Sequence, residues 1–237
     1  MTVPRVVSAD EWLAERKELL AAEEQAAKAL ANISERRRKL PAVRVEKEYL
    51  FDGATGTVSL LDMFEGRRQL IVQHFMFDPD WDEGCPVCSY QADSVGNLAH
   101  LHARSTTFAA VSRAPISKIE PFRQRMGWPF PWYSSLGSDF NYDFHVTHDE
   151  NVAPVQWNFM TKQELIDAGM PYFAGQGERG GVSVFYRDDD TILHTYSGFR
   201  SVVDLLCGTD QYLDLTPLGR QDQDVELRHH DKYAGDS

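Results

Sequence analysis

Two of the three cysteines in this 237-residue chain, Cys85 and Cys88, are separated only by Pro86 and Val87. Three cysteines cannot build the disulfide framework of a small secreted protein. In a reducing compartment, a pair with this C-x-x-C spacing is more often catalytic or metal-binding than structural. The pair therefore indicates either thiol–disulfide chemistry or a metal site.

The elements expected around this pair favour thiol chemistry. Residues 70–77 form an apolar run typical of a central strand, and residues 89–104 have the pattern of a helix. This helix is expected to extend back to the dithiol, with Cys85 as its N-cap residue. Pro86 is then its first residue, where a missing N–H costs nothing. Unpaired backbone N–H groups and the helix dipole stabilise a thiolate at this position, where cysteine pKa values fall to about 3.5 to 7.5.

The two sulfurs have different expected roles. As a thiolate, Cys85 is the nucleophile that attacks a disulfide, and Cys88, one helical turn further on, can attack the mixed disulfide and resolve it. The expected substrate is a disulfide-bearing protein or small molecule, and neither a cofactor nor a metal is expected.

An acidic loop precedes the dithiol. Residues 78–83 contain four carboxylates, Asp82 among them, and negative charges near a thiolate raise its pKa. If these carboxylates surround the sulfur, they favour neutral or basic partners over anionic thiols. The alternative is that they belong to an ordinary solvated turn. Trp81, in the same loop, can shield the sulfur or contact a partner.

Arg113 completes the candidate site. It follows a strand expected over residues 107–111, whose carboxyl end lies at the same sheet edge as Cys85. There it can offset the acidic loop or bind a substrate carboxylate, although an ordinary surface arginine fits the sequence equally well. Three aromatic residues follow in the sequence, Trp128, Trp132 and Tyr133. We expect them to pack in the core rather than to line a cleft at this sheet edge.

The remaining elements predict an α/β fold in which a mixed sheet is flanked by helices. Strands over residues 107–111 and 132–134 lie parallel to the central strand, because right-handed crossovers connect them. A helix over 116–126 and a hairpin over 182–187 and 192–197 complete the sheet. Residues 144–180 contain one expected helix, 161–168, and otherwise have no assigned place.

A long amphipathic helix is expected before this domain, over residues 9–40. Ser8 and Glu11 form a capping-box signature, and apolar residues recur at seven-residue intervals. The preferred interpretation is that this apolar stripe packs on the protein's own core; the alternative is a homodimer through the helix. The expected division is a helical extension (1–42), the main domain (43–200) and a C-terminal extension packed on it (201–237).

The chain resembles the thioredoxin superfamily, and more closely a group of bacterial thioredoxin-like proteins of uncharacterised function that are predicted to be dithiol–disulfide oxidoreductases. The resemblance covers nearly the whole chain and rests on the segments at 73–78, 84–90 with 92–93, 184–187, 194–196, and 212–217 with 219–220. It implies a thioredoxin-like fold and a redox-active dithiol at Cys85 and Cys88. Two departures stand out: Gly180 and Gly181 replace the cis-proline of thioredoxins, and Asp78 and Asp82 replace the proline and the Thr or Ser of peroxiredoxins.

Two alternative functions remain. A peroxiredoxin-like thiol peroxidase would use the same two cysteines, and a metal-binding or adaptor protein would use the fold without turnover. His100 and His102 lie too far along the expected helix, more than about 20 Å from Cys85, to share a metal with it. His74 is expected to be a satisfied core histidine and Cys207 a small buried residue, which leaves the H-x-x-H pair His145 and His148, with His229 and His230 near the end of the chain.

Composition narrows the partners further. The chain has 36 Asp and Glu against 24 Lys and Arg, a net charge of −12, which argues against a nucleic acid or an anionic membrane as a partner. No signal-peptide pattern or apolar run of membrane-spanning length is visible, so a cytoplasmic location is expected.

Overall fold

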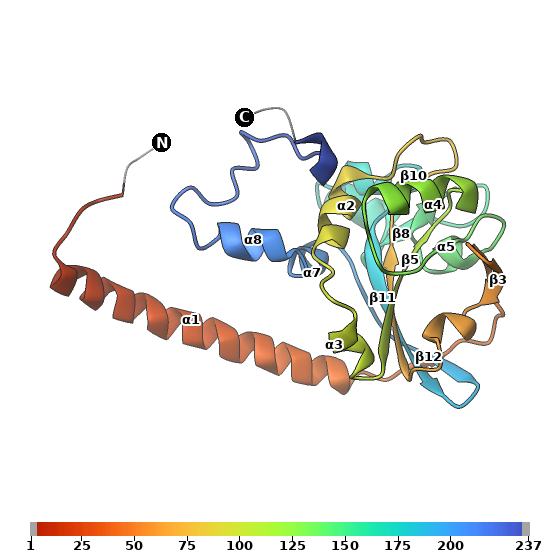
Figure 1. The fold of residues 1–237 in the computed structure, drawn as a ribbon, viewed down its shortest axis with the longest axis horizontal. Helices are drawn as coiled ribbons and strands as arrows, with labels where there is room; N and C mark the ends of the chain where they lie inside the picture. The colour runs from red at the N-terminus through yellow and green to blue at the C-terminus, as the bar shows by residue number, and fades with distance from the viewer. Residues whose placement is uncertain (1–3, 234–237) are drawn as a thin grey trace.

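The computed structural model of the protein describes residues 4–233. Its centre is a mixed eight-stranded sheet, from which one long helix projects (Figure 1). Across the sheet the strands follow the order β1 (Val43–Arg44), β12 (Thr191–Gly198), β11 (Gly181–Asp188), β4 (Gln69–His74), β5 (Thr106–Ser112), β6 (Trp132–Ser134), β2 (Leu50–Gly53) and β3 (Gly56–Ser59).

The central strands have the topology of the thioredoxin fold. β4 is parallel to β5, and the connection between them contains α2 (Pro86–Asp93) and α3 (Ala99–His102). β11 pairs with the other side of β4 in the antiparallel direction and forms a hairpin with β12. The predicted α/β class, with its parallel third strand β6 and its antiparallel hairpin, is therefore confirmed.

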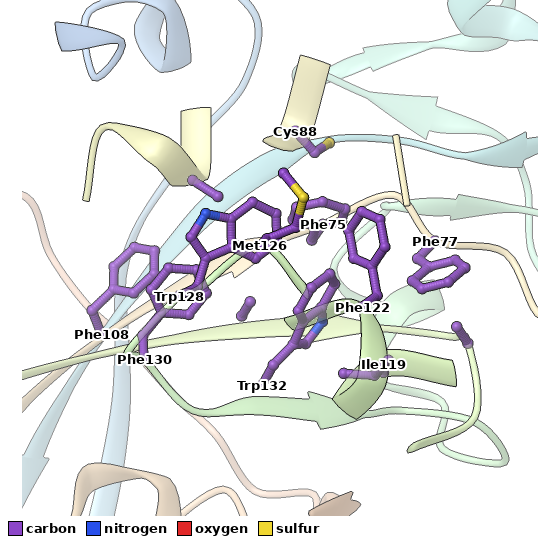
Figure 2. Close-up of a cluster of buried hydrophobic side chains, with 13 residues drawn as sticks. Phe75, Phe77, Cys88, Phe108, Ile119, Phe122, Met126, Trp128, Phe130 and Trp132 are labelled. Carbon is purple, nitrogen blue, oxygen red and sulfur yellow. The ribbon is translucent and has the colours of Figure 1, made fainter. Parts of the chain in front are cut away.

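One face of the sheet carries an aromatic cluster beneath α2 and α4 (Ile116–Arg125) (Figure 2). Phe122 of α4 packs there with Trp128 and Trp132, so the predicted core packing of these two tryptophans is confirmed. Cys88 of α2 belongs to the same cluster and lies at its edge. The dithiol helix is thus fixed to the sheet by the burial of apolar surface.

The opposite face has its own core. Ala109 and Val111 of β5 point to this side, because successive residues of a strand alternate between faces. The short helix η1 (Asp62–Phe64) and α5 (Phe140–Asp143) cover it, and Tyr133 packs against the cluster. Both faces of the central strands are therefore buried, as expected from their apolar sequences.

The helix expected over residues 89–104 is wrong as a single element. α2 ends at Asp93, and α3 starts only at Ala99. Gly96 and Asn97 lie between them, and the Asn97 side chain accepts a hydrogen bond from the Ala99 N–H (2.9 Å), which starts a new helical turn. The expectation that His100 and His102 lie far from Cys85 assumed one straight helix. The structure does not contain that helix, so this argument no longer applies.

The unassigned segment 144–180 folds into a small layer with its own core. β7 (Thr147–His148) pairs with β10 (Gly177–Glu178), and β8 (Gln156–Trp157) pairs with β9 (Met160–Thr161). Two short helices follow β9, α6 (Lys162–Asp167) and η2 (Pro171–Ala174). α6 is the helix expected from the sequence, and a capping box between Thr161 and Glu164 starts it.

The N-terminal helix α1 (Ala9–Arg38) begins where expected, with the Ser8 side chain accepting from the Glu11 N–H (3.2 Å). None of its residues is buried, and the ribbon leaves the body of the protein (Figure 1). The preferred interpretation, that its apolar stripe packs on the protein's own core, is therefore wrong. The seven-residue pattern correctly predicts an amphipathic helix, but it does not specify which surface covers it.

The chain after the sheet forms α7 (Ser201–Asp204), α8 (Gly208–Leu213) and the short helix η3 (His230–Lys232), which returns to the region of α2 (Figure 1). Within residues 4–233, no helix combines the length and the apolar character that crossing a bilayer requires.

Candidate functional site

Cys85 and Cys88 lie where the chain passes from β4 into α2. Cys85 is the N-cap residue, and Pro86 is the first residue of the helix. The Cys85 N–H donates to the Met76 carbonyl oxygen (2.9 Å), and the Met76 N–H donates to the Cys88 sulfur (3.4 Å). Both cysteines are free thiols, held against the chain segment that follows the central strand.

The two thiols have opposite electrostatic properties. The Cys88 S–H donates to the Cys85 sulfur, and this hydrogen bond is the largest cause that lowers the pKa of Cys85, to about 6. Burial opposes it, while the N–H groups of Cys88 and Val87 also stabilise the thiolate. The same S–H···S bond, together with burial, raises the pKa of Cys88 well above its ordinary value. At neutral pH the site therefore holds a thiolate at the half-buried Cys85 beside a protonated, buried Cys88.

The acidic loop is partly neutralised. Glu83 is bound by Lys232 and Arg125, which lower the pKa of its carboxyl group. Asp82 is exposed, and Trp81 is 38% exposed. Lys118 donates to the carbonyl oxygen of Trp81 (2.9 Å), so a cation of α4 helps to hold the loop. The expected effect of the remaining carboxylates on charged substrates stays a prediction.

Residues 229–232, which we call the C-terminal strap, hold the loop just before the dithiol. His229 is buried, and its Nε2 lies 2.8 Å from the Gly84 carbonyl oxygen. Asp231 binds Arg125, the same arginine that binds Glu83. This role of His229 could not be predicted from the sequence, because its contact is with a residue 145 positions away.

A buried glutamine attaches α2 to the sheet. Gln73 of β4 donates from Nε2 to the Cys88 carbonyl oxygen (3.0 Å) and to Gln91 Oε1 (3.2 Å). Its own Oε1 is buried without a hydrogen-bond partner among the described residues. Because one side chain contacts two residues of α2, rotation of this helix on the sheet is restricted.

Arg113 lies at the carboxyl end of β5 but does not contact the acidic loop through an ion pair. Its guanidinium pairs with the buried Glu178 (3.1 Å) and lies over the ring of Tyr142. Burial raises the pKa of Glu178 to about 7, although Thr147 and Arg113 oppose the shift. Arg113 is therefore tied into a polar cluster with β10.

A cavity of about 210 Å³ lies on the Gly180 side of Cys88. Gly180 keeps it open to the sulfur, since a Cβ at this position would stand 3.6 Å from Cys88 Sγ. The wall includes the stacked rings of Trp157 and Phe173, whose centroids are 3.9 Å apart. The absence of a proline at Gly180 is visible in the sequence, but the cavity is not.

Cys207 lines the same cavity as Cys88. It is 7% exposed, which confirms the prediction of a buried residue, and burial raises the pKa of its thiol to about 11. At neutral pH it is therefore a protonated thiol next to the candidate site.

The histidines do not assemble a metal site with the dithiol. No group of three or more potential His, Cys, Asp or Glu ligands occurs in the part of the chain that the structure describes. His148 instead makes hydrogen-bond contacts with the carbonyl oxygens of Gly175 and Gln156. His74 is buried, but only its Nε2 has a partner, Ser183 Oγ at 2.7 Å, so the prediction of a satisfied core histidine is correct for one ring nitrogen.

Replacing Gly84 by alanine should destabilise the site. The added Cβ would stand 2.6 Å from Phe75 and 3.0 Å from Phe122, inside the aromatic cluster. Overpacking of this kind costs roughly 1–3 kcal/mol, which urea unfolding can measure. Gly96→Ala is the matched control, because its Cβ meets no atom within 4 Å. Equal stabilities of the two variants would contradict the prediction.

A comparison with protein families places nearly the whole chain in one family. A family model described as "Bacterial protein of unknown function (DUF899)" matches residues 1–233. No curated protein matches the chain.

Several solved structures are similar to part of the chain. Peroxidoxin BcpB of Mycobacterium tuberculosis is 13% identical with a TM-score of 0.45, over 72% of this chain and 95% of its own. A cysteine-to-serine variant of PrxQ from Xylella fastidiosa is 11% identical with a TM-score of 0.45, over 73% of this chain and 94% of its own. Identities this low do not transfer an activity.

Proposed function

The chain belongs to the DUF899 family of bacterial proteins of unknown function, and we propose that it acts as a thiol–disulfide oxidoreductase, with Cys85 as nucleophile and Cys88 as resolving cysteine. The observation that carries the proposal is the position of the two thiols: Cys85 is the half-buried N-cap of α2, and Cys88 lies buried one helical turn further on. The lowered pKa of Cys85 and the raised pKa of Cys88 agree with this arrangement. Nucleophile and resolving thiol need these properties.

In the reducing direction, two exchange steps transfer two electrons. The Cys85 thiolate attacks one sulfur of the substrate disulfide, which forms a mixed disulfide and releases the other sulfur as a thiolate. Cys88 then loses its proton and attacks Cys85 Sγ, which releases the second substrate thiolate and leaves a Cys85–Cys88 disulfide. The released thiolates take up protons from Cys88 and from solvent, and an external dithiol restores the reduced pair.

The hydrogen bond between the thiols favours a protonated Cys88 until the first step is complete. While Cys85 is a thiolate, its charge and its hydrogen bond both raise the pKa of Cys88. Both causes disappear when Cys85 becomes part of a mixed disulfide, since its sulfur is then neutral. Cys88 is therefore deprotonated more easily after the attack, when its thiolate is required.

The cavity beside Cys88 supports a substrate class. Its aromatic wall, Trp157 and Phe173, fits an apolar group attached to the disulfide, and its volume of about 210 Å³ limits that group to a compact one. We propose that the substrate is a protein or small molecule whose disulfide carries such a group.

Gly180→Ala tests the role of the cavity. Its Cβ contacts with Cys88 Sγ (3.6 Å) and Met76 Sδ (3.7 Å) are ordinary van der Waals distances, so the fold should tolerate the change. We expect kcat/KM for disulfides that carry one compact aromatic ring to fall roughly tenfold, since one methyl group in an apolar pocket has an effect of this order. A disulfide without an apolar group should be affected much less, and Gly96→Ala should change neither value. Equal losses for both substrates would rule out the cavity as the substrate site.

A comparison of two reactions tests the proposed function itself. Wild-type protein with an external dithiol should reduce an uncharged model disulfide faster than it consumes hydrogen peroxide. In the peroxidase alternative, Cys85 is oxidised to a sulfenic acid and Cys88 condenses with it to release water. The thiolate is stabilised by Cys88 and backbone N–H groups, whereas Asp82 stands where peroxiredoxins place a hydroxyl donor, so disulfide exchange is favoured. Peroxide consumption without disulfide reduction would refute the proposal.

A further inference from the structure

The projecting helix α1 exposes an apolar face that no other part of the described chain covers. None of its residues is buried, and its large apolar side chains are 40–59% exposed: Trp12, Leu13, Leu19, Leu20, Leu30 and Ile33. A contiguous exposed apolar surface on a helix typically marks an interface. Most of the stability of protein helices also comes from packing an amphipathic face rather than from propensity.

The spacing of this face is symmetric about Ala26. Within the helix, the seven-residue series is Trp12, Leu19, Ala26 and Ile33. A two-fold axis at Ala26, perpendicular to the helix, would place Leu19 against the partner's Ile33, so large side chains meet on either side of the axis. Two small alanines would meet at the centre, where the helices can approach closely.

The charges of α1 also fit an antiparallel pair, because the two halves of the helix carry opposite net charges. Residues 9–24 contain six carboxylates and two cations, a net charge of −4, whereas residues 25–39 contain five cations and one carboxylate, a net charge of +4. An antiparallel pair sets each acidic half against the basic half of the other helix. A parallel pair sets like charges together, which is unfavourable.

We propose that α1 mediates a homodimer in which the helices of two copies pair in antiparallel orientation about Ala26. The self-complementary charges identify a second copy as the occupant, because a two-fold interface must be complementary to itself. This proposal does not depend on the activity of the dithiol.

Cysteine cross-linking tests the orientation. In a chain whose native cysteines are replaced by serine, Ala26→Cys should form an intermolecular disulfide under mild oxidation, because the two Cα atoms face each other. Trp12→Cys should not, since its counterpart lies at the other end of the helix pair. Efficient cross-linking of the Trp12→Cys variant would demonstrate a parallel arrangement and overturn the proposal.

Sedimentation velocity tests the dimer itself. At tens of micromolar, the wild-type protein should sediment with twice the 27.0 kDa mass of the chain. The double variant Leu19→Asp, Ile33→Asp should be a monomer, while the rate of Cys85 alkylation, which reports on the folded site, remains at the wild-type value. A monomeric wild-type protein, or a double variant that remains a dimer, would refute the interface.

Discussion

Cys88→Ser should accumulate a covalent adduct between Cys85 and its substrate, whereas Cys85→Ser should lose activity altogether. The serine hydroxyl is not ionised at neutral pH, so replacing the nucleophile should reduce kcat/KM by on the order of a thousand-fold or more. Replacing the resolving thiol leaves the attack intact but removes the second step. Non-reducing electrophoresis and intact mass should detect an adduct that an external dithiol releases.

Cys207 provides the control for this experiment. It is a buried, protonated thiol that lines the cavity beside Cys88, so it is the one other thiol near the mixed disulfide. Cys207→Ser alone should keep wild-type turnover. If Cys88→Ser continues to turn over and the double variant with Cys207→Ser stops, Cys207 can resolve the mixed disulfide. Failure to trap any adduct in that double variant would contradict the assignment of Cys85 as nucleophile.

Alkylation of Cys85 should follow a pH titration with a midpoint at about 6. About 90% of this thiol is then ionised at pH 7, against about 3% for a thiol with the ordinary pKa of about 8.5. Cys88→Ala removes the hydrogen bond that is the largest cause of the shift, so the midpoint should rise and alkylation at pH 7 should slow several-fold. Cys88→Ser retains a hydrogen-bond donor and should lie between alanine and the wild type.

The same shift affects stability in a defined direction. A thiol whose pKa is lower in the folded state stabilises the fold above its unfolded-state pKa, and this contribution is lost as the pH falls through about 6. The free energy of unfolding should therefore rise between pH 6 and pH 8.5 more steeply in the wild type than in Cys85→Ser. Identical slopes, together with an alkylation midpoint near 8.5, would show that the Cys85 pKa is not lowered.

The parts of the fold that follow from local sequence were predictable. The buried strand, Pro86 at the start of a helix and the hairpin of β11 and β12 each carry their signal within about ten residues. The break between α2 and α3 also had a local signal, Gly96 and Asn97, which the helical pattern around it concealed.

The surroundings of the dithiol depend on contacts between distant residues. Gln73 faces α2 because β4 carries it there, and His229 reaches Gly84 from the other end of the chain. Their residue types fit many surface or core positions, so the sequence alone does not select these contacts. The sequence does not determine the position of α1 for the same reason. Its apolar stripe indicates that the helix packs against another surface, but it does not identify that surface.

The C-terminal strap has a consequence for biosynthesis. The Gly84 carbonyl oxygen is bound by a histidine that the ribosome adds 145 residues later. A nascent chain that has already formed β4 and α2 therefore has its dithiol loop without His229 and Lys232. The loop before the dithiol therefore gains its hydrogen bond at Gly84 and its ion pair between Glu83 and Lys232 only after translation has passed the strap.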